Sequence, residues 1–152
     1  MDSLLSPISW HALDNQRRLC RLNRKGTDTI RCKSFGDDAA QLGAFVHEQI
    51  HWLLSDHLER VKTEAAVTEL RALYPTVPTE PPKGARGEWS TYLHLIVCTL
   101  ELEALIELVG ESRARQQLEG WTHYTWVYRT VLTDTERLGN VLRRHGIVVP
   151  ER

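Results

Sequence analysis

The sequence has almost no net charge and lacks long apolar runs. Its 19 basic and 20 acidic residues leave a formal net charge of −1, so no overall positive field attracts nucleic acid or anionic membranes. No segment is apolar over the length of a membrane-spanning helix. A Walker phosphate loop, a dinucleotide-binding glycine fingerprint and a nucleophile elbow are also missing, which removes support for those enzyme classes. We therefore expect neither nucleic acid nor a membrane as a partner.

Cysteine is scarce as well. Cys20, Cys32 and Cys98 are an odd number, and no two of them have the C-x-x-C spacing of redox or metal motifs. Such a pattern is typical of reduced thiols in a cytosolic protein; a Cys20–Cys32 disulfide across a hairpin is the alternative. The first seven residues have neither the positive segment nor the apolar run of a signal peptide. We expect a cytoplasmic protein.

The chain is long enough for one domain with a real core, and we expect a single domain over residues 1–152. Residues 18–22 and 29–35 flank a turn-forming cluster at 23–26, which predicts a strand pair. The expected fold class is therefore α+β, mostly helical, with a small N-terminal sheet. Helices are expected at about 38–57, 61–73, 90–109 and 111–119, and from Thr133 to His145, where Thr133 and Glu136 have the spacing of a capping box.

One segment, residues 75–87, contains four prolines and two glycines, which exclude regular structure. It is long for a loop inside a compact domain, and such loops are usually functional or disordered. We expect it to help shape a substrate cleft.

The segment His47-Glu48-Gln49-Ile50-His51 carries the most chemistry. Residues four apart share one face of a helix, so His47 and His51 can present two imidazoles to one metal ion. Glu48 projects roughly 100° round the same helix, where it can reach a water on the metal rather than the metal itself. Two nitrogen donors and an adjacent base suit zinc-assisted hydrolysis. The alternative is an amphipathic helix with two partly exposed histidines.

The surroundings of the motif favour a ligand pair. Apolar side chains recur at helical spacing beside the histidines and predict a helix face that packs on the core. The histidines then border a core or a cleft. The stripe consists of Leu42, Phe45, Val46, Gln49, Ile50 and Leu53.

A catalytic zinc needs a third protein ligand and an open position for water. His57 falls where the metzincins, which the H-E-x-x-H segment resembles, place a third histidine. Leu54 stands at the position of the metzincin glycine, which turns the chain out of the helix. With Leu54 the helix is expected to continue, which points His57 away from the histidine pair. We expect His57 not to be a ligand.

His94 and Glu101 are the preferred candidates, with Glu101 ranked first. They are seven residues apart, so they share one face of a largely apolar helix, offset by about 20°. A carboxylate and an imidazole are costly to bury there without a partner, and zinc or a ligand histidine is such a partner. The alternative places Glu101 on a solvated face. The remaining candidates are Glu64 and Glu69.

The H-E-x-x-H segment resembles that of the zincin-type metallopeptidases, and a glutamate on a later helix would make the chain similar to the gluzincins. The close resemblance covers residues 47–51 and extends loosely to Gly110. It implies a reduced zincin-like domain, Zn²⁺ as cofactor, Glu48 as general base, and a tyrosine or histidine that stabilises the oxyanion. His123 and Tyr124 are candidates for that last role; aromatic packing is the alternative. Position 105 is Leu, so the second acid of the gluzincin helix is absent.

The function expected from these residues is zinc-dependent hydrolysis of peptide bonds in a peptide or protein substrate. Glu48 would take a proton from the water and pass it to the leaving amine. One alternative is a zinc hydrolase of a non-peptide small molecule, because the motif does not specify what the water attacks. Another is a non-catalytic helical interaction protein with a structural metal, in which four protein ligands would fill the coordination shell.

Overall fold

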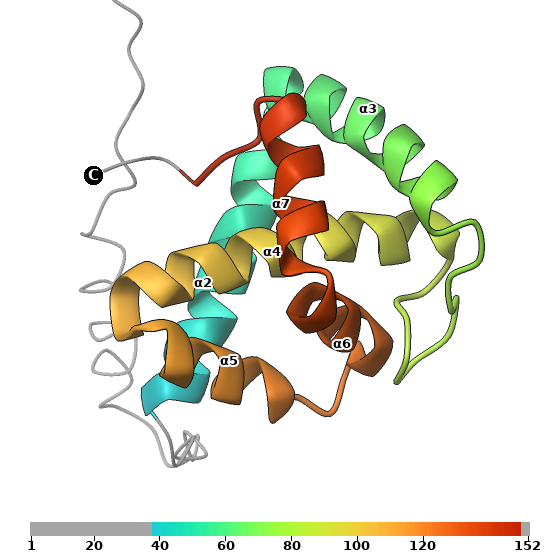
Figure 1. Ribbon diagram of the computed structural model, residues 1–152. Helices are drawn as coiled ribbons and strands as arrows, with labels where there is room; N and C mark the ends of the chain where they lie inside the picture. The colour runs from blue at the N-terminus through green and yellow to red at the C-terminus, as the bar shows by residue number, and fades with distance from the viewer. Residues whose placement is uncertain (1–37, 150–152) are drawn as a thin grey trace, which may run out of the picture. The chain divides into compact units, whose positions relative to one another are not determined.

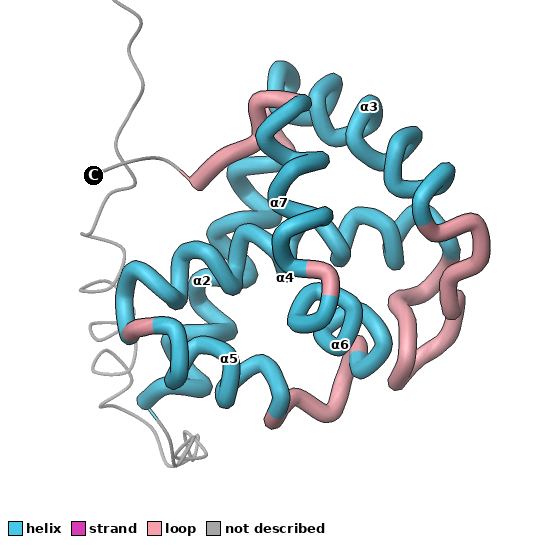
Figure 2. Tube along the Cα trace, in the orientation of Figure 1, coloured by secondary structure: helices cyan, strands magenta, loops and turns pink. Residues whose placement is uncertain are grey.

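The computed structural model describes residues 38–149, and these residues form helices joined by loops (Figures 1 and 2). They belong to one compact unit, Asp37–Arg152. Within this part of the chain the helices, in order, are α2 (Asp38–Leu54), α3 (His57–Leu73), α4 (Glu88–Val109), α5 (Glu111–Glu119), α6 (Thr125–Thr133) and α7 (Thr135–Arg144).

The expected α+β class is wrong. Residues 38–149 contain no strand, so the described fold is all-helical and carries no small sheet. The expectation depended on the strand pair at 17–35, which lies outside the described residues. In the described part, apolar side chains recur at helical spacing, and packing between helices alone builds the core. The single domain over residues 1–152 stays a prediction.

Helix α4 is the central element. It contacts every other helix of the described chain, and Figure 1 shows it crossing behind α7. A helix that is apolar all round is expected to be buried, and α4 is buried over most of its length, from Thr91 to Leu105. It is nevertheless no membrane span: among residues 38–149, no helix is both long enough and apolar enough to cross a bilayer.

α2 ends about three residues before its expected end near His57. α2 ends at Leu54, and α3 begins at His57 after a cap at Asp56, whose carboxylate accepts a 3.0 Å hydrogen bond from the Leu58 N–H. The side-chain cap satisfies a helix-terminal donor and fixes the new start. The expectation that the helix continues through Leu54 was therefore wrong, because a cap rather than a glycine redirects the chain.

α3, α4, α5 and α7 agree with the expected ranges to within about four residues, whereas α6 was not among the expected helices. α5 has the expected bounds, and Gly110 ends α4 with a positive φ of 85°. The capping box of Thr133 and Glu136 does not form, because Thr133 is the last residue of α6 and its hydroxyl donates to the Arg129 carbonyl.

The segment 75–87 has no helix or strand, as predicted, and its backbone fixes the start of α6. The Thr125 N–H donates to the Pro82 carbonyl at 2.8 Å, and the Trp126 N–H donates to the Lys83 carbonyl at 3.0 Å. These first-turn donors have no partner within their own helix, so the loop carbonyls satisfy them. The loop therefore sets the position of the residues just before α6.

The buried hydroxyl of Thr91 in turn holds this loop. It donates to the Pro78 carbonyl at 2.8 Å and accepts from the Ala85 N–H at 3.0 Å. A side chain of the central helix thus organises the loop from within, and the loop positions α6.

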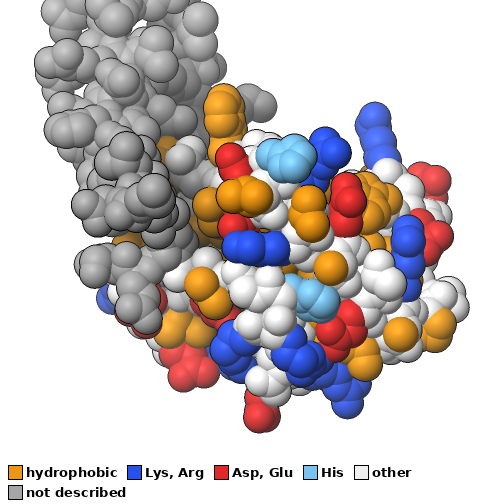
Figure 3. Space-filling view, turned by 90° about the horizontal axis from the view of Figure 1, so that it is seen from above, with side chains coloured by type: hydrophobic (Ala, Val, Ile, Leu, Met, Phe, Trp, Pro, Cys, Tyr) orange, Lys and Arg blue, Asp and Glu red, His pale blue; other side chains and the backbone are white. Residues whose placement is uncertain are grey.

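The surface seen from above the view of Figure 1 carries acidic and basic side chains next to one another, with hydrophobic side chains between them (Figure 3). A set of ion pairs joins α3 to α7. Glu69 pairs with Arg144 and with His145, whose Nε2 lies 2.8 Å from the carboxylate. These contacts link the two helices across the surface.

Candidate metal centre

The two histidines of the motif lie on the inner side of α2. Val46, Ile50 and Leu54 bury their side chains in the core, and this fixes the rotation of the helix. His47 is buried and His51 is half-buried. The Nε2 atoms of the two rings are 3.2 Å apart. Two imidazoles one turn apart therefore converge on one point at the edge of the core, as their spacing predicts.

A third imidazole joins them from α4. The ring centroid of His94 lies 5.1 Å from that of His51 and 5.6 Å from that of His47. One ring nitrogen from each histidine lies within 4.8 Å of the others. His94 Nδ1 donates a 2.6 Å hydrogen bond to the Ser90 carbonyl, one turn earlier. This bond leaves the lone pair of His94 on Nε2, where it is free to bind an ion.

Burial favours the neutral forms of His94 and His51 by lowering their pKa values. Burial lowers the pKa of His94 to about 4. Burial also lowers the pKa of His51, and the neighbouring His47 lowers it further, while the charge of Glu48 opposes both effects. A histidine must be unprotonated to bind a metal, so low pKa values keep these two side chains competent as ligands at neutral pH.

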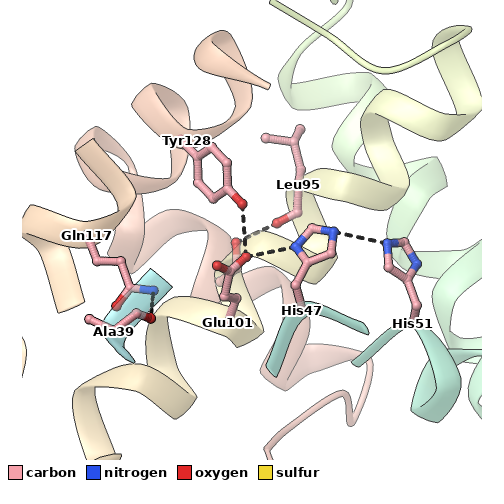
Figure 4. Close-up of polar contacts among 8 residues, drawn as sticks. Ala39, His47, His51, Leu95, Glu101, Gln117 and Tyr128 are labelled. Atoms are coloured by element: carbon pink, nitrogen blue, oxygen red, sulfur yellow. Dashed lines mark hydrogen bonds and ion pairs between the residues drawn. The ribbon is translucent and has the colours of Figure 1, made fainter. Parts of the chain in front are cut away.

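Glu101 lies on the other side of His47. Its carboxylate is fully buried and accepts a 2.9 Å hydrogen bond from His47 Nδ1 and a 3.1 Å hydrogen bond from the Tyr128 hydroxyl. Figure 4 shows Glu101 and His51 on opposite sides of the His47 ring. The donor group that includes Glu101 is formed with His47 and Cys98, and not with His51 or His94. The carboxylate thus faces the back of the histidine cluster.

Glu48 lies at the exposed edge of the cluster. Its carboxylate makes no hydrogen bond or ion pair with any described residue, yet its charge raises the pKa of His51 and contributes to the raised pKa of Tyr124. It is therefore close enough to both side chains for an electrostatic effect and remains accessible to water. A base that acts on a bound water needs this combination.

Tyr124 covers the histidines from the segment before α6. It is the one described non-glycine residue with positive φ, at 51°, a left-handed conformation that costs free energy for a tyrosine. The conformation brings its ring to a centroid distance of 4.2 Å from His94. Burial, together with the nearby acidic groups, raises the pKa of Tyr124, so the hydroxyl keeps its proton at neutral pH.

The remaining predicted residues lie farther from the cluster. His123 is exposed, and its ring packs near Trp121, Tyr124 and Tyr128, with centroids 4.9–5.9 Å away. Packing against these rings partly shields the His123 ring from water, and this partial burial lowers its pKa. His57 is exposed at the start of α3 and belongs to no donor group of the described residues.

Two further contacts organise the site. Ser90 is paired with His94 and Tyr128 with Glu101, and neither pairing was expected. The first has a local signal, because residues four apart on a helix can share a hydrogen bond. The second joins different helices and has none.

Comparisons with models of protein families, with curated proteins and with solved structures find no significant match to this chain.

Proposed function

We propose that this chain is a zinc-dependent hydrolase that cleaves peptide bonds and holds its ion through His47, His51 and His94. The observation that carries the proposal is the convergence of three imidazole nitrogens within 4.8 Å, with the unpaired carboxylate of Glu48 beside them. The resemblance of residues 47–51 to the zincin motif supports the same chemistry.

The donor set fits zinc. Imidazole nitrogen is a preferred ligand of Zn²⁺, and three protein ligands with an open fourth position are typical of catalytic zinc. The group has three members in the described chain, and a structural site would be expected to use four. We propose His94 as the third ligand in place of Glu101, because Glu101 bonds to the Nδ1 edge of His47 whereas His51 faces the Nε2 edge.

The residues around the ion have distinct roles. The ion that His47, His51 and His94 would hold would lower the pKa of a bound water and polarise the substrate carbonyl. Glu48 accepts a proton from the attacking water and returns it to the leaving amine. The Tyr124 hydroxyl, held over His94 and still protonated at neutral pH, donates a hydrogen bond to the carbonyl oxygen as negative charge develops there. His123 is the alternative donor.

The substrate is proposed to be a peptide or protein, and the site of action the cytoplasm; the odd number of cysteines without C-x-x-C spacing supports the compartment. Cys98, the described member of the three, is free and buried.

Metal analysis and hydrolysis assays together test the function. Protein purified without chelators is expected to contain about one zinc per chain, and His51→Ala is expected to lose it. The zinc-loaded protein is expected to cleave members of a broad peptide panel. A wild-type chain that binds no zinc on titration would overturn the metal site. Full zinc loading with cleavage of small amides, but of no peptide, would replace the proposed substrate class.

A further inference from the structure

We propose that Tyr128 is a positioning residue of the metal centre, which acts through Glu101 to fix the tautomer and orientation of His47. This inference rests on the proposed metal site, because its effect on zinc requires His47 to be a ligand. Tyr128 itself contacts none of the proposed ligands by a hydrogen bond; its hydroxyl reaches the carboxylate that holds one of them.

The carboxylate of Glu101 is fully buried. Its side chain comes from the middle of α4, the central helix, and has no solvent exposure. A buried carboxylate is stable only with hydrogen-bond donors or a positive charge nearby. Glu101 Oε2 receives two donors, His47 Nδ1–H from α2 and the Tyr128 hydroxyl from α6. Three helices therefore meet at one oxygen atom.

The contact with Glu101 also sets the tautomer of His47. An ionised carboxylate only accepts hydrogen bonds, so with Glu101 ionised the proton of the His47 bond resides on Nδ1. A neutral imidazole with a proton on Nδ1 has its lone pair on Nε2. His47 Nε2 is the atom that faces His51, 3.2 Å away. The Glu101 bond thus leaves Nε2, which faces the histidine cluster, as the nitrogen of His47 that can bind a metal.

The orientation of the Glu101 carboxylate depends on the Tyr128 hydroxyl. Glu101 Oε1 is buried without a hydrogen-bond partner among the described residues, so the carboxylate has little else to hold it. Loss of the Tyr128 hydroxyl leaves a single donor on a buried carboxylate, which can then rotate about its side-chain bonds. The nearby Cys98 thiol is a weak donor and a poor replacement. His47 would lose its fixed partner.

Tyr128→Phe tests the inference, because it removes the hydroxyl and keeps the ring in the core. Partners of ligand histidines typically change metal affinity by roughly 10–100-fold, so we expect zinc affinity, measured by chelator competition, to fall within that range. Glu101→Gln is expected to weaken zinc binding to a similar degree. Tyr74→Phe is the matched control: the Tyr74 hydroxyl also donates to a carboxylate, Asp134 at 2.8 Å, but it lies outside the site. The zinc affinity of Tyr74→Phe is expected to equal that of the wild type.

Nitrogen NMR of the metal-free protein provides a readout that general destabilisation would not change. In the folded wild type and Tyr74→Phe we expect His47 to carry its proton on Nδ1, and in Tyr128→Phe a mixture of the two tautomers. Unchanged zinc affinity and an unchanged tautomer in folded Tyr128→Phe would overturn the inference. If the wild type binds no zinc, the proposed function fails, and the tautomer measurement alone decides whether Tyr128 positions His47.

Discussion

The ring centroids of His94 and Tyr124 are 4.2 Å apart, with an angle of 42° between the ring planes. His94 belongs to the central helix, and Tyr124 to the segment before α6. The left-handed backbone of Tyr124 brings the two rings together, and the loop carbonyls of Pro82 and Lys83 hold the residues that follow it. The proposed ligand and the proposed oxyanion donor are therefore positioned by one connected set of contacts.

Substitution of His94 distinguishes the proposed ligand set from the alternatives. His94→Ala is expected to lower zinc content from about one per chain to near zero, because two imidazoles alone are a weak site for zinc. His57→Ala, in an exposed residue outside the cluster, is the control and is expected to retain the ion. Elemental analysis after dialysis measures both. Zinc retained by His94→Ala would show that another residue completes the site.

The role of Glu48 is separable from metal binding. Glu48→Gln keeps the size of the side chain and removes the base, so we expect normal zinc content with hydrolysis reduced by roughly 10²–10⁴-fold. Peptide cleavage and elemental analysis of the same preparation measure the two effects. Loss of zinc in this variant would identify Glu48 as a ligand, and undiminished cleavage would place the base elsewhere.

The hydroxyl of Thr91 is expected to be necessary for the stability of the loop at residues 75–87. Thr91→Val preserves the shape but leaves the Ala85 N–H and the Pro78 carbonyl without their partner. The free energy of unfolding, measured with urea, is expected to fall by about 1–3 kcal/mol. Thr99→Val is the control, because the equally buried Thr99 hydroxyl bonds within its own helix, to the Leu95 carbonyl. Equal losses in both variants would contradict the role of Thr91.

The contact between α3 and α7 predicts a pH dependence of stability. Hydrogen bonds from Arg144 and His145 lower the pKa of Glu69 below its usual value of 4.5. A carboxylate with a lower pKa in the folded state stabilises the fold above its unfolded pKa, and this contribution disappears as the pH falls through the folded value.

Glu69→Gln is therefore expected to be less stable than the wild type near pH 6 and to approach it below pH 4.5, in urea unfolding series at each pH. Glu64→Gln, whose exposed side chain pairs with Arg60 at 3.5 Å, is the control and is expected to show a smaller difference. A Glu69→Gln deficit that persists unchanged to low pH would contradict the electrostatic explanation.

Much of the helical part of the fold could be predicted from the sequence, because its signals are local. The apolar spacing around His47 and His51 predicts α2, and Gly110 marks the end of α4. The cap at Asp56 was missed, and the lack of a glycine at position 54 wrongly predicted that the helix continues past Leu54. The predicted strands at 17–35 lie outside the described residues, so the mixed fold class had no support in the remainder.

The choice between His94 and Glu101 could not be made from the sequence. Both lie on one face of α4, and what separates them is a distance of roughly 10 Å along the helix axis. Which of them meets His51 depends on where α2 crosses α4, a property of tertiary packing that periodicity does not encode. The same holds for Tyr128, whose hydroxyl reaches Glu101 only because α6 also packs on α4.

The central position of α4 has a consequence for motion in the protein. Because this helix contacts every other described helix, its backbone amides can exchange with solvent only when most of the packing around them opens. The free energy needed to open the segment that carries His94 and Glu101 is therefore expected to approach the free energy of global unfolding. Glu48 and Tyr124, in contrast, lie at exposed or half-buried positions. His94, the proposed ligand on α4, would remain still while the groups that meet the substrate adjust to it.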